Sequence, residues 1–80
     1  SNEINFQQYK IYPSPATNFL HVETDGFFNL SVYDLYGRMV INDNGQDRIN
    51  LNVSGLNKGV YFYSITKNKN SLSRGKVIIK

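Results

Sequence analysis

Few side chains in this sequence have the chemistry of a catalytic or metal centre. His21 is the one histidine, and there is no cysteine. A protein-bound metal needs about three or four ligands, and a serine nucleophile needs a base beside it. His21 has no obvious companion of either kind, and it alternates with Leu20 and Val22 along a short apolar stretch. We therefore predict no catalytic residue, no metal site and no cofactor, and we interpret His21 as a surface histidine.

Carboxylates are the other candidate ligands. The four aspartates all lie in or beside predicted turns: Asp25, Asp34, Asp43 and Asp47. Aspartate forms turns because its side chain accepts hydrogen bonds from backbone amides two residues further on. Carboxylates and turn carbonyls also suit Ca²⁺, so a calcium site shared by two loops is the alternative. Turn formation explains each aspartate without a ligand, and no phosphate-binding glycine loop, serine elbow or HExxH motif is present.

Basic residues gather near the end of the sequence. From residue 67 to residue 80 there are five cations and no acid, namely Lys67, Lys69, Arg74, Lys76 and Lys80. Lysines on an edge strand prevent aggregation between sheets, which is the simple interpretation. The functional interpretation is a strand that docks onto a partner, formed by Arg74, Lys76, Val77, Ile78, Ile79 and Lys80. No nucleic-acid partner is predicted, because the net charge is only +3 and these cations are not spread along a groove.

Size and composition limit the molecule to one small domain. Its 80 residues leave no room for a second core, and 40% hydrophobic residues with 19% charged ones make it too apolar for a disordered tail. No apolar run approaches the ~20 residues of a membrane span, so no membrane insertion is predicted. We expect a piece of a longer protein, with residues 1–8 as a linker or cloning remnant and residues 9–80 as the domain.

Hydrophobic periodicity predicts an all-β fold, a seven-stranded antiparallel immunoglobulin-like β-sandwich with no helix. Ile and Val together number thirteen, whereas Ala occurs once. Apolar stretches recur about every ten residues, with turn residues between them. The predicted strands are 9–12, 19–23, 28–33, 38–42, 48–53, 60–67 and 72–80, of which 60–67 is expected to be central and covered on both faces. The expected core is Leu20, Val22, Leu30, Val32, Val40, Leu51, Leu56, Tyr61 and Ile65.

Three stretches in order resemble the signature of a known family. We name them the Tyr-Pro motif (12–20), the hairpin motif (32–40) and the loop motif (56–62). Their matching positions are Tyr12, Pro13, Pro15, Ala16, Asn18, Leu20, Val32, Asp34, Gly37, Val40, Leu56, Gly59 and Tyr61. With the closing basic and aliphatic strand at 76–80, the pattern resembles the type A C-terminal sorting domain of the type IX, or Por, secretion system. Ser14 replaces the family's usual Asn, but Ser can also bond the backbone in a turn.

The resemblance implies a secretion signal and not an enzyme. It implies a passenger protein joined N-terminally and a passage through the periplasm of a Gram-negative bacterium. It further implies recognition by an outer-membrane translocon, removal by a sortase-like peptidase, and attachment of the passenger to the cell surface or its release. Two alternatives stay open: an immunoglobulin-like or fibronectin-like module that binds carbohydrate or protein, and a spacer domain without a ligand. Because one fold can serve all three, the binding surface must separate them.

Overall fold

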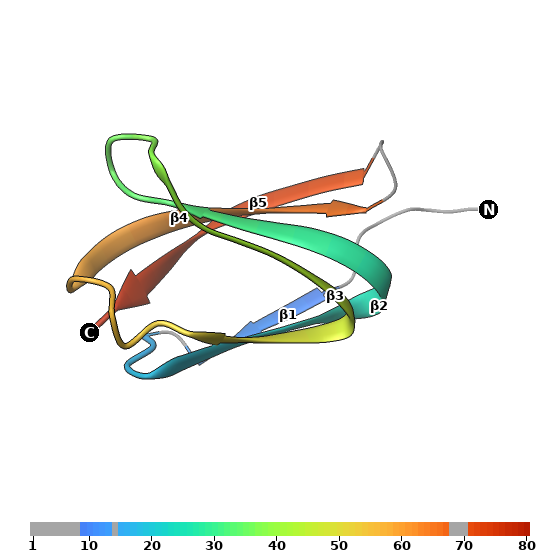
Figure 1. Ribbon diagram of the computed structural model, residues 1–80, viewed down its shortest axis with the longest axis horizontal. Helices are drawn as coiled ribbons and strands as arrows, with labels where there is room; N and C mark the ends of the chain where they lie inside the picture. The colour runs from blue at the N-terminus through green and yellow to red at the C-terminus, as the bar shows by residue number, and fades with distance from the viewer. Residues whose placement is uncertain (1–8, 14, 68–70) are drawn as a thin grey trace.

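Strands make up all the regular structure in the described part of the chain. The computed structural model describes residues 9–13, 15–67 and 71–80, so the expected linker at 1–8, Ser14 and Lys69 lie outside it. The strands are β1 (Tyr9–Tyr12), β2 (Phe19–Tyr33), β3 (Met39–Asn52), β4 (Gly59–Lys67) and β5 (Ser71–Ile79), shown in Figure 1. The prediction of an all-β fold without a helix is confirmed for the described residues.

The seven predicted strands are found as five, because two predicted turns are bends within long strands. Stretches 19–23 and 28–33 form one strand, β2, and stretches 38–42 and 48–53 form β3. The two strands bend together where their register shifts between Glu23 and Phe27. At the bend, Gly26 and Asp47 have φ angles of 80° and 68°. The Gly26 amide donates a 2.8 Å hydrogen bond to Asp47 Oδ1. Gly26 and Asp47 are residue types that also form turns. Here they form an irregularity like a β-bulge, which bends a strand without ending it.

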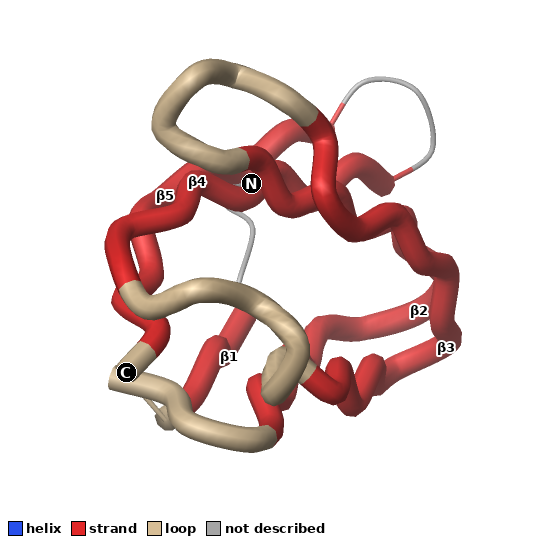
Figure 2. The backbone as a smooth tube through the Cα atoms, turned by 60° about the vertical axis from the view of Figure 1, so that its left-hand side comes forward, coloured by secondary structure: helices blue, strands red, loops and turns tan. Residues whose placement is uncertain are grey.

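The sheet curls so that its two halves face each other across the core (Figure 2). In the first half, β1 and the end of β3 pair with the start of β2. In the second half, the end of β2 lies between the start of β3 and β4, and β4 pairs with β5. All these pairings are antiparallel, in the order β1-β2-β4-β5 with β3 beside β2. The predicted central position of 60–67 is therefore confirmed.

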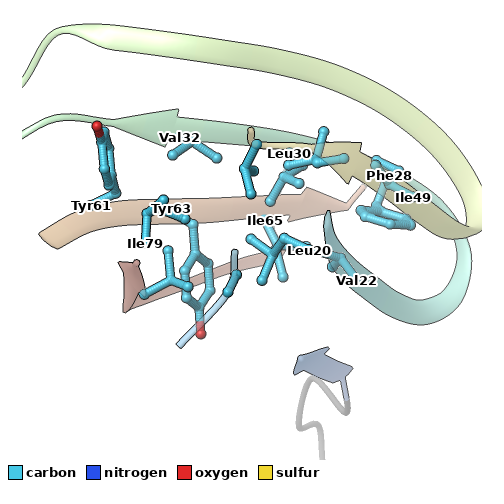
Figure 3. Packing of buried hydrophobic residues seen from close by; sticks show 14 residues of the cluster. Leu20, Val22, Phe28, Leu30, Val32, Ile49, Tyr61, Tyr63, Ile65 and Ile79 are labelled. Atoms are coloured by element: carbon cyan, nitrogen blue, oxygen red, sulfur yellow. The ribbon is translucent and has the colours of Figure 1, made fainter. Parts of the chain in front are cut away.

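Side chains from both halves of the sheet fill the core (Figure 3). Its buried apolar members are Ala16, Leu20, Val22, Phe28, Leu30, Val32, Ile49, Leu51, Val53, Tyr61, Tyr63, Ile65, Val77 and Ile79. Seven of the nine predicted core residues are among them, and Leu56 is partly buried against them. Tyr9 on β1 and Tyr63 on β4 also join the two halves, with their hydroxyls 2.9 Å apart and their rings edge to face. Burial and the hydrogen bond to Tyr9 raise the pKa of Tyr63 above its ordinary value.

Two expectations about burial are wrong. Val40 is 38% exposed, because Ile41 and not Val40 pairs with the buried Val32. Neighbouring residues of a strand point to opposite faces, so Ile41 packs against the core and Val40 faces outward. Strand β4 is not covered on both faces either, since Phe62 is 43% exposed on the outer side.

Candidate functional site

The motif residues that matched the family are mainly residues that hold the fold. Ala16 of the Tyr-Pro motif is fully buried, and it joins the chain before β2 to the end of β5. Its amide donates a 2.9 Å hydrogen bond to the Ile78 carbonyl, and the Lys80 amide donates a 2.7 Å bond to the Ala16 carbonyl. A cis peptide bond joins Tyr12 to Pro13, both of which are exposed. The structure therefore brings the Tyr-Pro motif and the closing strand together.

Asp34 organises the turn of the hairpin motif. Its Oδ1 accepts hydrogen bonds from the amides of Tyr36 (2.9 Å) and Arg38 (3.0 Å), and its Oδ2 lies 2.8 Å from Arg38 Nε. Gly37 has a φ of 81° and donates its amide to the Asp34 carbonyl at 3.0 Å. The turn predicted beside Asp34, between the predicted strands 28–33 and 38–42, is confirmed as a tight hairpin turn. Partial desolvation raises the pKa of Asp34, but the hydrogen bonds from Arg38 and Tyr36 outweigh it and hold this pKa below its usual value.

The Asp34 hydrogen bonds predict a pH-dependent contribution to stability. A carboxyl whose pKa is lower in the folded state stabilises the fold above its unfolded pKa of about 4, and this stabilisation is lost as the pH falls through the folded value. We expect Asp34→Asn to unfold at lower denaturant concentration than the parent at pH 7. The gap should narrow steadily below about pH 4, measured by urea titration of both proteins. A gap that stays constant to about pH 2 would contradict this role of the Asp34 charge.

The loop motif lies beside the hairpin motif. Leu56 is half-buried against the core, and the Tyr61 hydroxyl donates a 2.7 Å hydrogen bond to the Asn57 carbonyl. Gly59 has a φ of 147°, which favours glycine. Residues 34–40 and residues 55–61 line the two sides of one shallow hollow. In Figure 1 the loops that carry the three motifs and the end of β5 lie at the same end of the molecule.

The predicted docking strand is β5, and its side chains alternate between buried and exposed. Val77 and Ile79 are buried, whereas Arg74, Lys76 and Ile78 are exposed. Among the described residues β5 pairs with β4 along one edge and with Ala16 at its end. The Ile78 carbonyl and the Lys80 amide are therefore bonded to Ala16, and the outer edge is not open over its whole length. Backbone groups alternate in direction along a strand, so those of Arg74 and Lys76 point to the same outer side as the Ile78 carbonyl.

The side chains considered for catalysis or metal binding make local contacts. His21 Nδ1 lies 2.6 Å from Asn50 Oδ1, and the centroid of the His21 ring lies 5.3 Å from that of Tyr12 and 6.4 Å from that of Phe19. Asp43 accepts a 2.8 Å bond from the Asn44 amide, within β3 and not at a turn as expected. In the described ranges no three His, Asp or Glu side chains are grouped for a metal. No helix in these ranges is long and apolar enough to span a membrane.

Sequence reasoning missed a groove on the outer face of the second half of the sheet. Its floor is formed by β4 and β5, and the Tyr33–Gly37 segment forms its wall; together they line an open hollow of about 990 Å³. The alternation of Phe62, Ser64 and Thr66 in the sequence marks one face of β4. Nothing local in the sequence shows that a turn almost thirty residues earlier stands over that face.

The sequence comparisons agree with this arrangement of motifs. Residues 10–80 match the family model described as the secretion system C-terminal sorting domain. The chain therefore belongs to this family, and it is a C-terminal sorting signal of the type IX secretion system. Beta-agarase D of Zobellia galactanivorans is 30% identical over 73 residues, which cover 91% of this chain and 15% of the agarase. The family is one of sorting signals and not of catalysts, and its members are exported to the cell surface or released.

Proposed function

We propose that this domain is recognised as a folded unit by the outer-membrane translocon of the type IX system. A passenger joined before residue 1 would cross the periplasm of a Gram-negative bacterium and then be exported. A sortase-like peptidase would remove the domain, leaving the passenger attached to the surface or free. The observation that carries this proposal is the family match over 10–80, together with the meeting of its motifs at one end of the fold. The chain spans about a seventh of the agarase that it resembles, so any enzymatic activity would belong to the passenger.

The proposed fold of the signal is an immunoglobulin-like sandwich built from five strands. The bent strands β2 and β3 each contribute to both halves of the curled sheet. Counted as separate segments, their four halves with β1, β4 and β5 correspond to the seven strands of such a sandwich. The shared core between the two halves supports this description.

Within the domain we place translocon docking on β5, from Arg74 to Lys80. The exposed cations and the outer backbone edge at Arg74 and Lys76 support strand addition, in which backbone bonds give affinity. Charged side chains such as Lys76 and Lys80 speed the encounter with an acidic surface more than they tighten the complex. In the competing interpretation the same lysines only protect an edge from aggregation.

If β5 is the docking strand, export should depend on the charges of Lys76 and Lys80, whereas the stability of the folded domain should not. We expect a passenger fused to the Lys76→Ala, Lys80→Ala variant to be exported more slowly, although the free energy of unfolding changes by only ~0.5 kcal/mol per surface substitution. Pulse-labelled export and a urea titration measure the two quantities. Normal export and processing of this variant would assign the lysines to edge protection. Normal export after deletion of residues 78–80 would rule out docking through β5.

A second function is supported by a row of rings on the first half of the sheet, of which Phe19 and Tyr12 are exposed and His21 is partly buried. Phe19 and His21 are nearly parallel at 13°, and Tyr12 follows at 38° to His21. Stacked rings beside amides could hold a carbohydrate, as in the binding-module alternative. Such a module would lose its ligand on Phe19→Ser while export continued, whereas a sorting signal needs no such ligand. The row contains only two exposed aromatic residues besides His21, which favours the sorting function.

A further inference from the structure

The groove missed by sequence reasoning combines apolar and basic side chains in one place. In its floor, Phe62 of β4 pairs with Lys76 of β5, and Ser64 pairs with Arg74. On its other side Phe62 pairs with Tyr33, where the wall begins. Phe62 is 43% exposed and Leu35, in the wall, is 65% exposed. Exposed apolar side chains that gather around a hollow mark interaction sites more often than isolated ones do. The groove is thus amphipathic, with an apolar side at the wall and a basic side at β5.

The free charge of this groove is positive. Arg74 and Lys76 are exposed, and neither forms an ion pair with a described acidic side chain. Asp34 also lines the groove, but its carboxylate is bonded to two amides and to the Arg38 guanidinium 2.8 Å away. An occupant would therefore meet two unneutralised cations beside exposed apolar surface, which complements an acidic and apolar segment.

We propose that this groove binds an extended segment of a partner protein in which acidic and apolar residues alternate. Side chains alternate in direction along an extended chain, so one set would lie on Phe62 and Leu35. A carboxylate at the basic side of the groove would then reach Lys76 or Arg74. A nucleic acid fits less well, because it needs several cations along its backbone track and this groove offers two. The identity of the partner as a translocon component rests on the proposed function. The chemistry of the bound segment does not depend on that function.

The test uses a fluorescent peptide in which glutamate and leucine alternate. Its fluorescence anisotropy is measured as the 80-residue chain is added at low salt. We expect the acidic peptide to bind, and the same peptide with lysine in place of glutamate not to bind. Because one exposed charge pair is worth up to about fivefold in affinity, the Arg74→Ala, Lys76→Ala variant should bind about tenfold more weakly. Phe62→Ser should also weaken binding, since it removes the apolar floor. Lys58→Ala is the matched control, because Lys58 lines the hollow on the other side of the hairpin.

Several results would overturn the groove proposal. These are no binding of the acidic peptide, equal binding of the lysine peptide or of a single-stranded oligonucleotide, and equal losses in the Lys58→Ala control. A parallel export assay separates this proposal from the proposed function. If the Phe62→Ser, Arg74→Ala, Lys76→Ala variant folds and loses the peptide but is exported normally, the groove is not the export docking site. The peptide result stands on its own if the parent chain fails to direct export.

Discussion

Phe28→Ala should destabilise the domain by about 3–5 kcal/mol, the range for removing a large aromatic side chain from a core. Phe28 is fully buried and is the largest of the fully buried side chains in the described residues. It follows the bend of β2 and lies opposite Gly45 of β3, so its loss leaves a cavity between the two halves of the sheet. In a domain this small, that loss is comparable with the whole free energy of folding. Urea titration followed by circular dichroism measures the change.

The adjacent phenylalanine provides the control for this prediction. Phe27 is 64% exposed and points to the opposite face, so Phe27→Ala should change the free energy of unfolding by less than about 0.5 kcal/mol. The residue type and the strand are the same, and only burial differs. Similar effects of the two substitutions would contradict the assignment of Phe28 to the buried face of β2 and of Phe27 to the exposed face. If Phe28→Ala does not fold at all, Phe28→Leu keeps most of the volume and should show the same ranking with a smaller loss.

Gly45→Ala should cost about 1–3 kcal/mol, the range for overpacking a filled site. A Cβ at this position would lie 2.4 Å from Ile49 Cγ1 and 2.7 Å from the Arg48 carbonyl oxygen. The carbonyl belongs to the backbone of the β3 bend, so it cannot move without disturbing the pairing with β2. Gly55→Ala is the control, because nothing lies within 4 Å of its Cβ position. Equal thermal stability of the two variants would show that Gly45 does not lie this close to Arg48 and Ile49.

Some elements could be predicted because their causes are local. The alternation from Phe28 to Val32 identified the buried face of β2, and Asp34 with Gly37 identified the hairpin turn. Both patterns depend on residues a few positions apart. The turn interpretation failed at Asp25-Gly26, because the same residue types also serve where paired strands bend. It failed at 43–45 because these residues pair regularly with residues 28–30 of β2. Only the pairing partner distinguishes a bend from a turn, and the partner is distant in sequence.

The parts of the site that could not be predicted depend on long-range contacts. Ala16, the single alanine, bonds to Ile78 and Lys80, and nothing near residue 16 indicates that partner. The groove likewise needs the hairpin turn to stand over Phe62 and Lys76. The resemblance identified the family, whose model matches residues 10–80. The structure adds that Ala16 of the Tyr-Pro motif is hydrogen-bonded to the end of β5, the strand on which we propose docking.

The measurement that tests the central claim most directly is export of a neutral reporter. A fluorescent protein with an ordinary signal peptide is joined to residues 1–80 and produced in two otherwise identical strains, with and without a functional type IX translocon. The matched control joins the same reporter to an unrelated β-domain of similar size. We predict that the reporter reaches the surface or the medium only with residues 1–80 and only when the translocon is present. Retention of this fusion inside translocon-competent cells, or equal export of the control, would contradict the assignment of this domain as a sorting signal.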